Sequence, residues 1–178
     1  MKLKLSKYFL YFMMYAIIGW CYEVFLEVVV YRWGFSNRGE LFGPYCPVYG
    51  FGAIAFILGV YPIIKKQESF KKKIFLIPIV FLLCMLIATS LELFTSYICE
   101  WTSGGWKWDY SRYSFNFQGR IALNPSVRFG IGGVAFLYLL QPLFEKIAKK
   151  LGDKKVKIVS LILFTIIIVD CIYTFIIK

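Results

Sequence analysis

The chain has 178 residues, of which 60% are hydrophobic and 20% aromatic, and its formal net charge is +11. Soluble domains are nearer half apolar, so this composition excludes an ordinary soluble domain and indicates an integral membrane protein with one domain, residues 1–178. The lysines lie in short runs between apolar segments, which is the pattern of membrane loops. We therefore expect membrane lipid, and no nucleic acid, among its partners.

Five apolar segments approach the roughly 20 residues with which a helix crosses a bilayer. They predict an all-α, polytopic membrane helix bundle with helices at approximately 8–31, 48–64, 74–98, 126–144 and 156–177. The first segment is charged and then apolar like a signal peptide, but its apolar run is too long for one. Pro62 is expected to end the second helix, and Asn124–Pro125 is expected to begin the fourth.

The basic residues predict the orientation of these helices. Lysines precede the first helix and fill the connections after the second and the fourth. The positive-inside rule makes that side cytoplasmic, which puts the N-terminus inside and the C-terminus outside. Such a chain is expected to be a multi-pass protein of a bacterial plasma membrane.

The arginines follow a different pattern from the lysines. All of them fall on the outer side, where Lys107 and Lys178 also lie; they are Arg32, Arg38, Arg112, Arg120 and Arg128. A guanidinium binds carboxylate or phosphate through two parallel N–H groups, so the pattern indicates a local binding task. The alternative is that these arginines are unrelated and reach from the membrane interface to water.

The stretch from Asn37 to Gly52, NRGELFGPYCPVYGFG, contains four glycines and two prolines. This composition suits neither a helix nor a strand. We expect an irregular segment after the first helix, either re-entrant within the membrane or a simple external loop. The residues expected to shape it are Gly39, Gly43, Pro44, Cys46, Pro47, Tyr49 and Gly50.

Acidic residues inside the apolar segments are the strongest functional signal: Glu23, Glu27, Glu92 and Asp170. A charge exposed to lipid is costly, so such residues normally face the bundle interior and mark function. At a rise of about 1.5 Å per residue, the three glutamates lie near the outer third of the bilayer, level with the arginines. In one interpretation they line an outward-facing cavity for a ligand, with a protonatable glutamate. In the other they pair with arginines and only fix the position of the external loops.

The longest connection, from Cys99 to Pro125, is rich in tryptophan, tyrosine and phenylalanine, as expected of a segment at the headgroup level. The alternation from Tyr113 to Phe117 indicates a short strand or hairpin. Asp109 and Asn116 lie in this connection and add polar groups to the expected site.

The sequence gives little support to a metal or cofactor site, because it has five cysteines without C-x-x-C spacing and no histidine. We expect no metal and no cofactor. A Cys46–Cys99 disulfide requires that both residues face outward, and packing roles for the cysteines are the alternative.

Several short motifs together resemble the CmpB-type putative ABC-transporter permease family of small bacterial membrane proteins. The resemblance runs from about residue 19 to residue 133. Its motifs are Gly19-Trp20-x-x-Glu23, Asn37-Arg38-Gly39, Gly43-Pro44-x-Cys46-Pro47-x-Tyr49-Gly50, Glu92-x-x-Thr95, Trp108-Asp109-Tyr110-Ser111, Phe115-Asn116 and Gly119-Arg120-Ile121. The resemblance implies a transport component. The chain has no GxxxxGK[ST] loop, so any ATPase is expected to be a separate subunit.

We therefore expect a membrane transport component that takes an anionic or zwitterionic solute or a lipid headgroup, with a homo-oligomer of the chain among its expected arrangements. The expected ligand site comprises Glu23, Glu27, Asn37, Arg38, Glu92, Asp109, Asn116 and Arg120. The alternatives are a phospholipid- or lipid-carrier-binding protein and a structural or regulatory membrane subunit. An intramembrane enzyme that uses paired carboxylates is less favoured, because no histidine can activate a serine or cysteine, and no catalytic residue is assigned.

Overall fold

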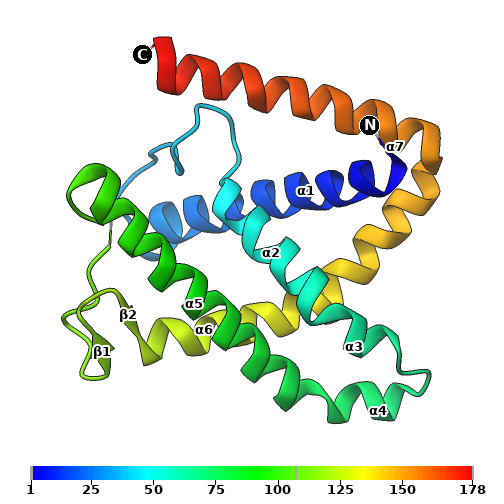
Figure 1. Cartoon of the computed structure of the whole chain (residues 1–178), viewed down its shortest axis with the longest axis horizontal. Helices are drawn as coiled ribbons and strands as arrows, with labels where there is room; N and C mark the ends of the chain where they lie inside the picture. Colours follow the sequence, from blue (N-terminus) through cyan, green and yellow to red (C-terminus); the bar gives the residue numbers. More distant parts are fainter. Residues whose placement is uncertain (1, 107, 178) are drawn as a thin grey trace. The chain divides into compact units, whose positions relative to one another are not determined.

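The computed structural model describes residues 2–106 and 108–177 and is almost entirely helical (Figure 1). Lys107 and Lys178, which the sequence places on the outer side, lie outside the described residues. The chain divides into two compact units. Unit 1 comprises Met1–Ile54 and Pro142–Lys178, and unit 2 comprises Ala55–Gln141.

Within the described ranges, three helices are long and apolar enough to cross a membrane: Leu3–Val30, Ile77–Thr102 and Leu123–Ile177. The first consists of α1 (Leu3–Phe25) and a π-helical turn (Leu26–Val30). The second lies within α5 (Ile77–Ser103). The third consists of α6 (Leu123–Ala135), a π-helical turn (Phe136–Leu140), α7 (Gln141–Ile172) and a last π-helical turn (Tyr173–Ile177).

The third span is interrupted at Gly152, which has φ 76° and ψ 157°. A side chain strongly disfavours this positive φ, and the helix cannot continue through it. Figure 1 shows the chain changing direction in the orange part of α7. The fourth and fifth helices expected from the sequence lie on either side of this elbow, so the expected count of five separate helices is not confirmed.

The second expected helix is shorter than the sequence suggested. α2 (Pro47–Gly59) has 13 residues, and Val60 follows it with φ −114°. Two short helices, α3 (Tyr61–Lys65) and α4 (Phe70–Phe75), precede α5. Pro62 lies in the first turn of α3, where the missing N–H has no intrahelical partner to lose. The expectation that Pro62 ends the second helix was therefore wrong.

The start of α6 also differs from the expectation. Ala122, in an extended conformation, is its N-cap, and Asn124 and Pro125 already lie in the first turn. A proline there again costs no helical hydrogen bond. The hairpin expected nearby is confirmed in a short form: β1 (Asn116–Phe117) pairs antiparallel with β2 (Ile121–Ala122).

In unit 1, α1 and the part of α7 after the elbow run parallel to each other (Figure 1). Ser160 donates a 2.8 Å hydrogen bond to the Ser6 carbonyl, and about one turn further along both helices the Phe9 and Phe164 rings are 5.5 Å apart. The buried core between these helices also includes Leu41 and Tyr45 from the irregular segment. This segment is therefore packed into unit 1 and does not merely connect two helices.

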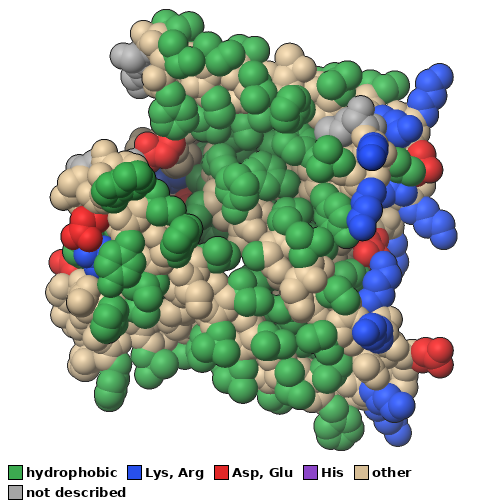
Figure 2. Space-filling view, in the orientation of Figure 1, with side chains coloured by type: hydrophobic (Ala, Val, Ile, Leu, Met, Phe, Trp, Pro, Cys, Tyr) green, Lys and Arg blue, Asp and Glu red, His purple; other side chains and the backbone are tan. Residues whose placement is uncertain are grey.

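In unit 2, α5 and α6 pack antiparallel through small residues. The Phe81 ring covers Gly130, and the Cys84 side chain covers Gly133 so closely that an added Cβ would lie 2.4 Å from it. The Thr89 hydroxyl donates a 2.8 Å hydrogen bond to Ser126. Hydrophobic side chains cover much of the visible surface of both units, as expected of faces in contact with lipid (Figure 2).

Candidate functional site

The acidic residues in the spans bond to the connections that lie outside the long helices. In unit 1, Glu23, Glu27 and Asp170 contact the stretch from Ser36 to Tyr49. In unit 2, Glu92 contacts Tyr110. Each carboxylate thus joins a membrane helix to another part of its own unit.

Glu27 holds the beginning of the irregular segment. Its carboxylate accepts hydrogen bonds of 2.7 and 3.0 Å from the Ser36 hydroxyl, and Arg38 Nε lies 2.9 Å from Oε2. The Arg38 Nε–H is not directed at that oxygen, so the contact is an ion pair without hydrogen-bond alignment. The Glu27 side chain is 8% exposed and that of Arg38 33%. Glu27 therefore positions Arg38 while the guanidinium stays accessible.

Asn37 organises the turn beside this pair. Its Oδ1 accepts a 2.8 Å hydrogen bond from Trp20 Nε1. Its Nδ2 donates to the carbonyls of Leu41 and Phe42 at 3.2 and 2.9 Å. Since both ends of the amide are already bonded, this side chain fixes the loop more than it offers groups to a ligand.

Glu23 accepts a hydrogen bond from the Tyr49 hydroxyl. The Tyr49 ring lies directly against Gly19, where an added Cβ would be 2.2 Å from Cγ. Gly50 faces Phe12 in the same way. Glycine is thus required where the start of α2 meets α1, because small residues let two helices approach closely.

Cys46 anchors the end of the irregular segment. Its N–H donates a 2.9 Å hydrogen bond to the Ala16 carbonyl, and its side chain is buried. Burial raises the pKa of the Cys46 thiol to about 11, so it stays a packing residue. All five cysteines are free, and the expected alternative of a Cys46–Cys99 disulfide is not formed in the part of the chain that the structure describes.

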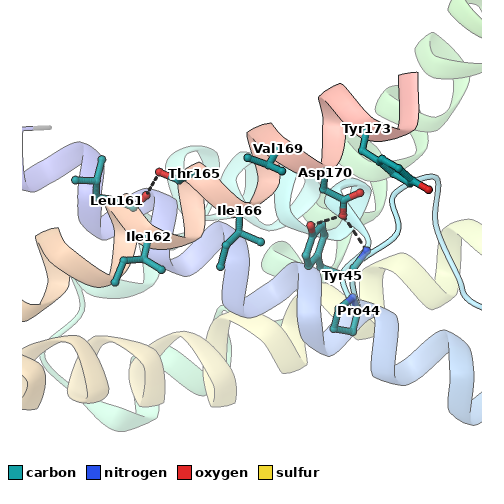
Figure 3. A pocket seen from close by; sticks show the side chains of 10 residues that line it. Pro44, Tyr45, Leu161, Ile162, Thr165, Ile166, Val169, Asp170 and Tyr173 are labelled. Carbon is teal, nitrogen blue, oxygen red and sulfur yellow. Dashed lines mark hydrogen bonds between the residues drawn. The ribbon is translucent and has the colours of Figure 1, made fainter. Parts of the chain in front are cut away.

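Asp170 receives donors from the irregular segment and from the last π-helical turn. The N–H groups of Phe42 and Gly43 lie 3.0 and 2.8 Å from its two oxygens, and the hydroxyls of Tyr45 and Thr174 donate as well. Gly43 and Tyr45 also line an open groove of ≈ 680 Å³ along one face of α7 (Figure 3). Figure 3 shows Asp170 on the same helix as a row of aliphatic side chains, with Tyr45 and Pro44 facing Asp170 from the irregular segment.

Glu92, in unit 2, has an asymmetric environment. Its Oε1 accepts a 2.8 Å hydrogen bond from Tyr110, whereas its Oε2 is buried without a hydrogen-bond partner among residues 2–106 and 108–177. Burial raises the pKa of Tyr110, and the neighbouring Glu92 adds to this, so the phenol remains a donor. An unpaired buried acceptor is costly, which makes Glu92 the unusual acid of the four.

Arg120 is buried and fully engaged. It lies 2.6 Å from Glu100 Oε2 and donates to Ser96 and Gln118 at 3.3 Å. Its guanidinium carbon is 3.9 Å from the centroid of the Trp106 ring and 4.2 Å from that of Tyr97. Stacking of this kind fixes the arginine and leaves little for a ligand.

Asp109 and Asn116 shape the turn that carries Gly119. Asp109 Oδ1 accepts a 2.8 Å hydrogen bond from the Ser111 N–H, which holds the pKa of Asp109 below its usual value. Asn116 accepts from the Gly119 N–H at 2.9 Å and donates to the Tyr113 carbonyl at 2.7 Å. Gly119 has φ 67° and is covered by Ser111 and Asp109.

The expected site residues therefore fall into two groups, one in each unit. Glu23, Glu27, Asn37 and Arg38 belong to unit 1, and Glu92, Asp109, Asn116 and Arg120 to unit 2. The sequence reasoning missed partners that carry no motif, in particular Ser36, Glu100 and Trp106. It noted Asp170 as an intramembrane acid but left it out of the site. Apart from Thr174, the donors on Asp170 lie more than a hundred residues away in the chain, so no local pattern reveals them.

Apolar spans, acids in these spans that hydrogen-bond within the protein, and an exterior dominated by aliphatic and aromatic side chains define a helical integral membrane protein. A family described as putative ABC-transporter type IV matches residues 10–175, and the chain belongs to this family. This confirms the resemblance seen in the motifs. No curated protein and no solved structure matched the chain.

Proposed function

We propose that the chain is a transport component of a bacterial plasma membrane, with an outward-facing polar site for an anionic or zwitterionic solute or lipid headgroup. The proposed topology has five crossings, with the N-terminus cytoplasmic and the C-terminus outside. The parallel course of α1 and the end of α7 supports it, because the first and last crossings would then run in the same direction. The family description supports the transport class.

Arg38 carries this proposal. Its side chain is one-third exposed (33%) and is positioned by the buried Glu27. Its two terminal Nη groups have no partner within the described ranges, so they can bind a carboxylate or phosphate in the bidentate manner of arginine. Arg120 is already enclosed by Glu100 and aromatic rings, so we assign it to the support of its loop.

Glu23 and Glu92, two of the glutamates in the spans, differ in their surroundings. Glu23 is bonded to Tyr49, whereas Glu92 keeps one buried oxygen without a partner in the described residues. We therefore assign the proton exchange of a transport cycle to Glu92, with Tyr110 holding its other oxygen.

The test is a thermal-shift screen of the purified protein against small carboxylates, phosphates and zwitterions. Compounds that stabilise the wild type should lose this effect in Arg38→Gln. The matched control is Arg32→Gln, an exposed arginine of the same connection that should behave like the wild type. If every compound raises the melting temperature of Arg38→Gln as much as that of the wild type, Arg38 does not bind the solute. If the variant loses stability without any compound, the role of the ion pair is structural.

The groove of ≈ 680 Å³ in unit 1 favours a second candidate, a protein that binds a phospholipid or lipid carrier. Its aliphatic lining, which includes Leu161, Ile166 and Val169, suits a hydrocarbon chain. Mass spectrometry of lipid retained on purification separates the two candidates. Enrichment of one lipid species over the bulk membrane, lost in Ile166→Trp, supports lipid binding; an unselective lipid content contradicts it.

The family description also supports a separate ATPase subunit as a partner. We propose this association, and a homo-oligomer of the chain, as the arrangement in which transport occurs. Cross-linking in native membranes followed by mass spectrometry tests both: an ATPase or a second copy should be captured, and capture of neither contradicts the arrangement.

A further inference from the structure

The elbow of α7 joins two helical arms, and each arm has one buried row of side chains. Phe144 and Ala148, before Gly152, are 4% and 2% exposed, and Val156 and Ser160, after it, are both 0% exposed. The opposite sides carry exposed lysines: Lys146, Lys149, Lys150, Lys154, Lys155 and Lys157. Figure 2 shows basic side chains gathered around this elbow.

On the arm after the elbow, the lysines share a face with exposed aliphatic residues. Ile158 and Leu161 follow Lys154 by four and seven positions and are 50% and 57% exposed. Ile162 follows Lys155 by seven positions and is 54% exposed. Residues at these spacings lie on one side of a helix. Since exposed aliphatic residues of a membrane helix face lipid, Lys154 and Lys155 lie at the end of a lipid-facing row.

The arm before the elbow has the same arrangement. Leu143 and Ile147 are 48% and 37% exposed. Lys146 lies three positions after Leu143, and Lys150 lies seven positions after it, so both are on the same side as these aliphatic residues. On both arms, therefore, lysines lie where a lipid-facing helix side reaches the membrane surface.

The charges of these four lysines are not neutralised within the protein. Asp153, at the elbow, lies 2.9 Å from Lys7 of α1. Glu145 has other contacts and lies on a half-buried row of its arm. Lys146, Lys150, Lys154 and Lys155 have no ion-pair partner in residues 2–106 and 108–177.

We infer that Lys146, Lys150, Lys154 and Lys155 form a binding surface for the headgroups of anionic phospholipids. Their position decides between lipid and an acidic protein. A soluble partner would approach the tip of the elbow from water, whereas these side chains continue the rows that contact hydrocarbon. Clustered lysines next to a membrane helix attract anionic headgroups, and lysine suits this mobile contact because it binds as a point charge. This surface is independent of the solute site proposed at Arg38.

The test compares the melting temperature of the purified full chain in mixed micelles containing either phosphatidylglycerol or phosphatidylcholine. Phosphatidylglycerol should stabilise the wild type more, and added salt should reduce the difference, because the Debye length is about 10 Å at 0.1 M ionic strength. Lys154→Gln/Lys155→Gln and Lys146→Gln/Lys150→Gln should each lose at least about half of this difference while melting normally in phosphatidylcholine.

Two controls separate position from total charge. Lys154→Arg/Lys155→Arg keeps the charge and should keep the effect. Lys4→Gln/Lys149→Gln removes the same charge from helix sides that do not face lipid, because Lys4 shares a side with the buried Tyr11 and Lys149 with the half-buried Glu145. This variant should also keep the stabilisation by phosphatidylglycerol. Equal stabilisation by both lipids, or an equal loss in this control, overturns the inference. The inference is also overturned if a soluble polyglutamate peptide stabilises the protein and phosphatidylglycerol does not. That result would indicate an acidic protein partner.

Discussion

The Asp170 carboxylate accepts a 2.8 Å hydrogen bond from the backbone N–H of Gly43, which lies 127 residues earlier in the chain. The same carboxylate also binds the Phe42 N–H and the hydroxyls of Tyr45 and Thr174. Phe42 and Gly43 lie in neither a helix nor a strand, so no regular secondary structure pairs their N–H groups. An acid that looks costly in a span thus replaces the missing secondary structure of the irregular segment.

We therefore expect Asp170→Asn to destabilise the protein by about 2 kcal/mol, because hydrogen bonds to a charged group are lost and an amide N–H₂ faces a donor. Reversible unfolding in detergent micelles measures the change. The control is Asp153→Asn, whose ion pair with Lys7 is solvent-exposed and should contribute no more than about 1 kcal/mol. Equal effects of the two substitutions would show that Asp170 does not hold the segment.

Gly19→Ala is expected to cost about 1–3 kcal/mol, because the new Cβ must displace the Tyr49 ring. An ideal Cβ at Gly19 lies 2.2 Å from Tyr49 Cγ, whereas one at Gly52 has nothing within 4 Å. Gly52→Ala in the same unit should therefore be neutral or stabilising by up to about 1 kcal/mol, through helix propensity. The melting temperatures of the two variants, each compared with that of the wild type, test this prediction. A neutral Gly19→Ala would mean that α1 and α2 do not pack as closely as described.

The sequence predicted what depends on local pattern and missed what depends on distant contacts. The long spans followed from apolar run length, and the hairpin near Asn116 followed from the alternation along Tyr113 to Phe117. Helix ends were harder, since α2 ends at Gly59, before the proline that was expected to end it, and Pro62 begins the next helix. The carboxylates were recognised because charge in a span is rare, but their partners were not. Tyr45 and Asp170 meet only through the fold.

Arg120→Lys should destabilise unit 2 by about 2 kcal/mol, although it keeps the charge. The guanidinium is stacked 3.9 Å from the Trp106 centroid and bonds Glu100 at 2.6 Å, and an ammonium cannot do both. Arg112→Lys is the matched control, because Arg112 is exposed and should change stability by less than about 0.5 kcal/mol. Tryptophan fluorescence during unfolding reports the change at this loop. If both variants behave alike, Arg120 is not an anchor of the loop.

Asp109 predicts a pH dependence of the outer loop. The Ser111 N–H holds the pKa of Asp109 below its usual value when the protein is folded. In the unfolded chain the Asp109 side chain has a pKa of about 3.9 and binds the proton more readily. The stabilisation is therefore fully present above the pKa of Asp109 in the unfolded chain and is lost as the pH falls through its pKa in the folded protein.

Asp109→Asn should be less stable than the wild type at neutral pH, and the difference should shrink as the pH is lowered below about 4. Melting curves of both proteins across this range measure it, with Asp153→Asn as the control for general acid effects. A difference that does not depend on pH would mean that the charge of Asp109 does not stabilise the turn.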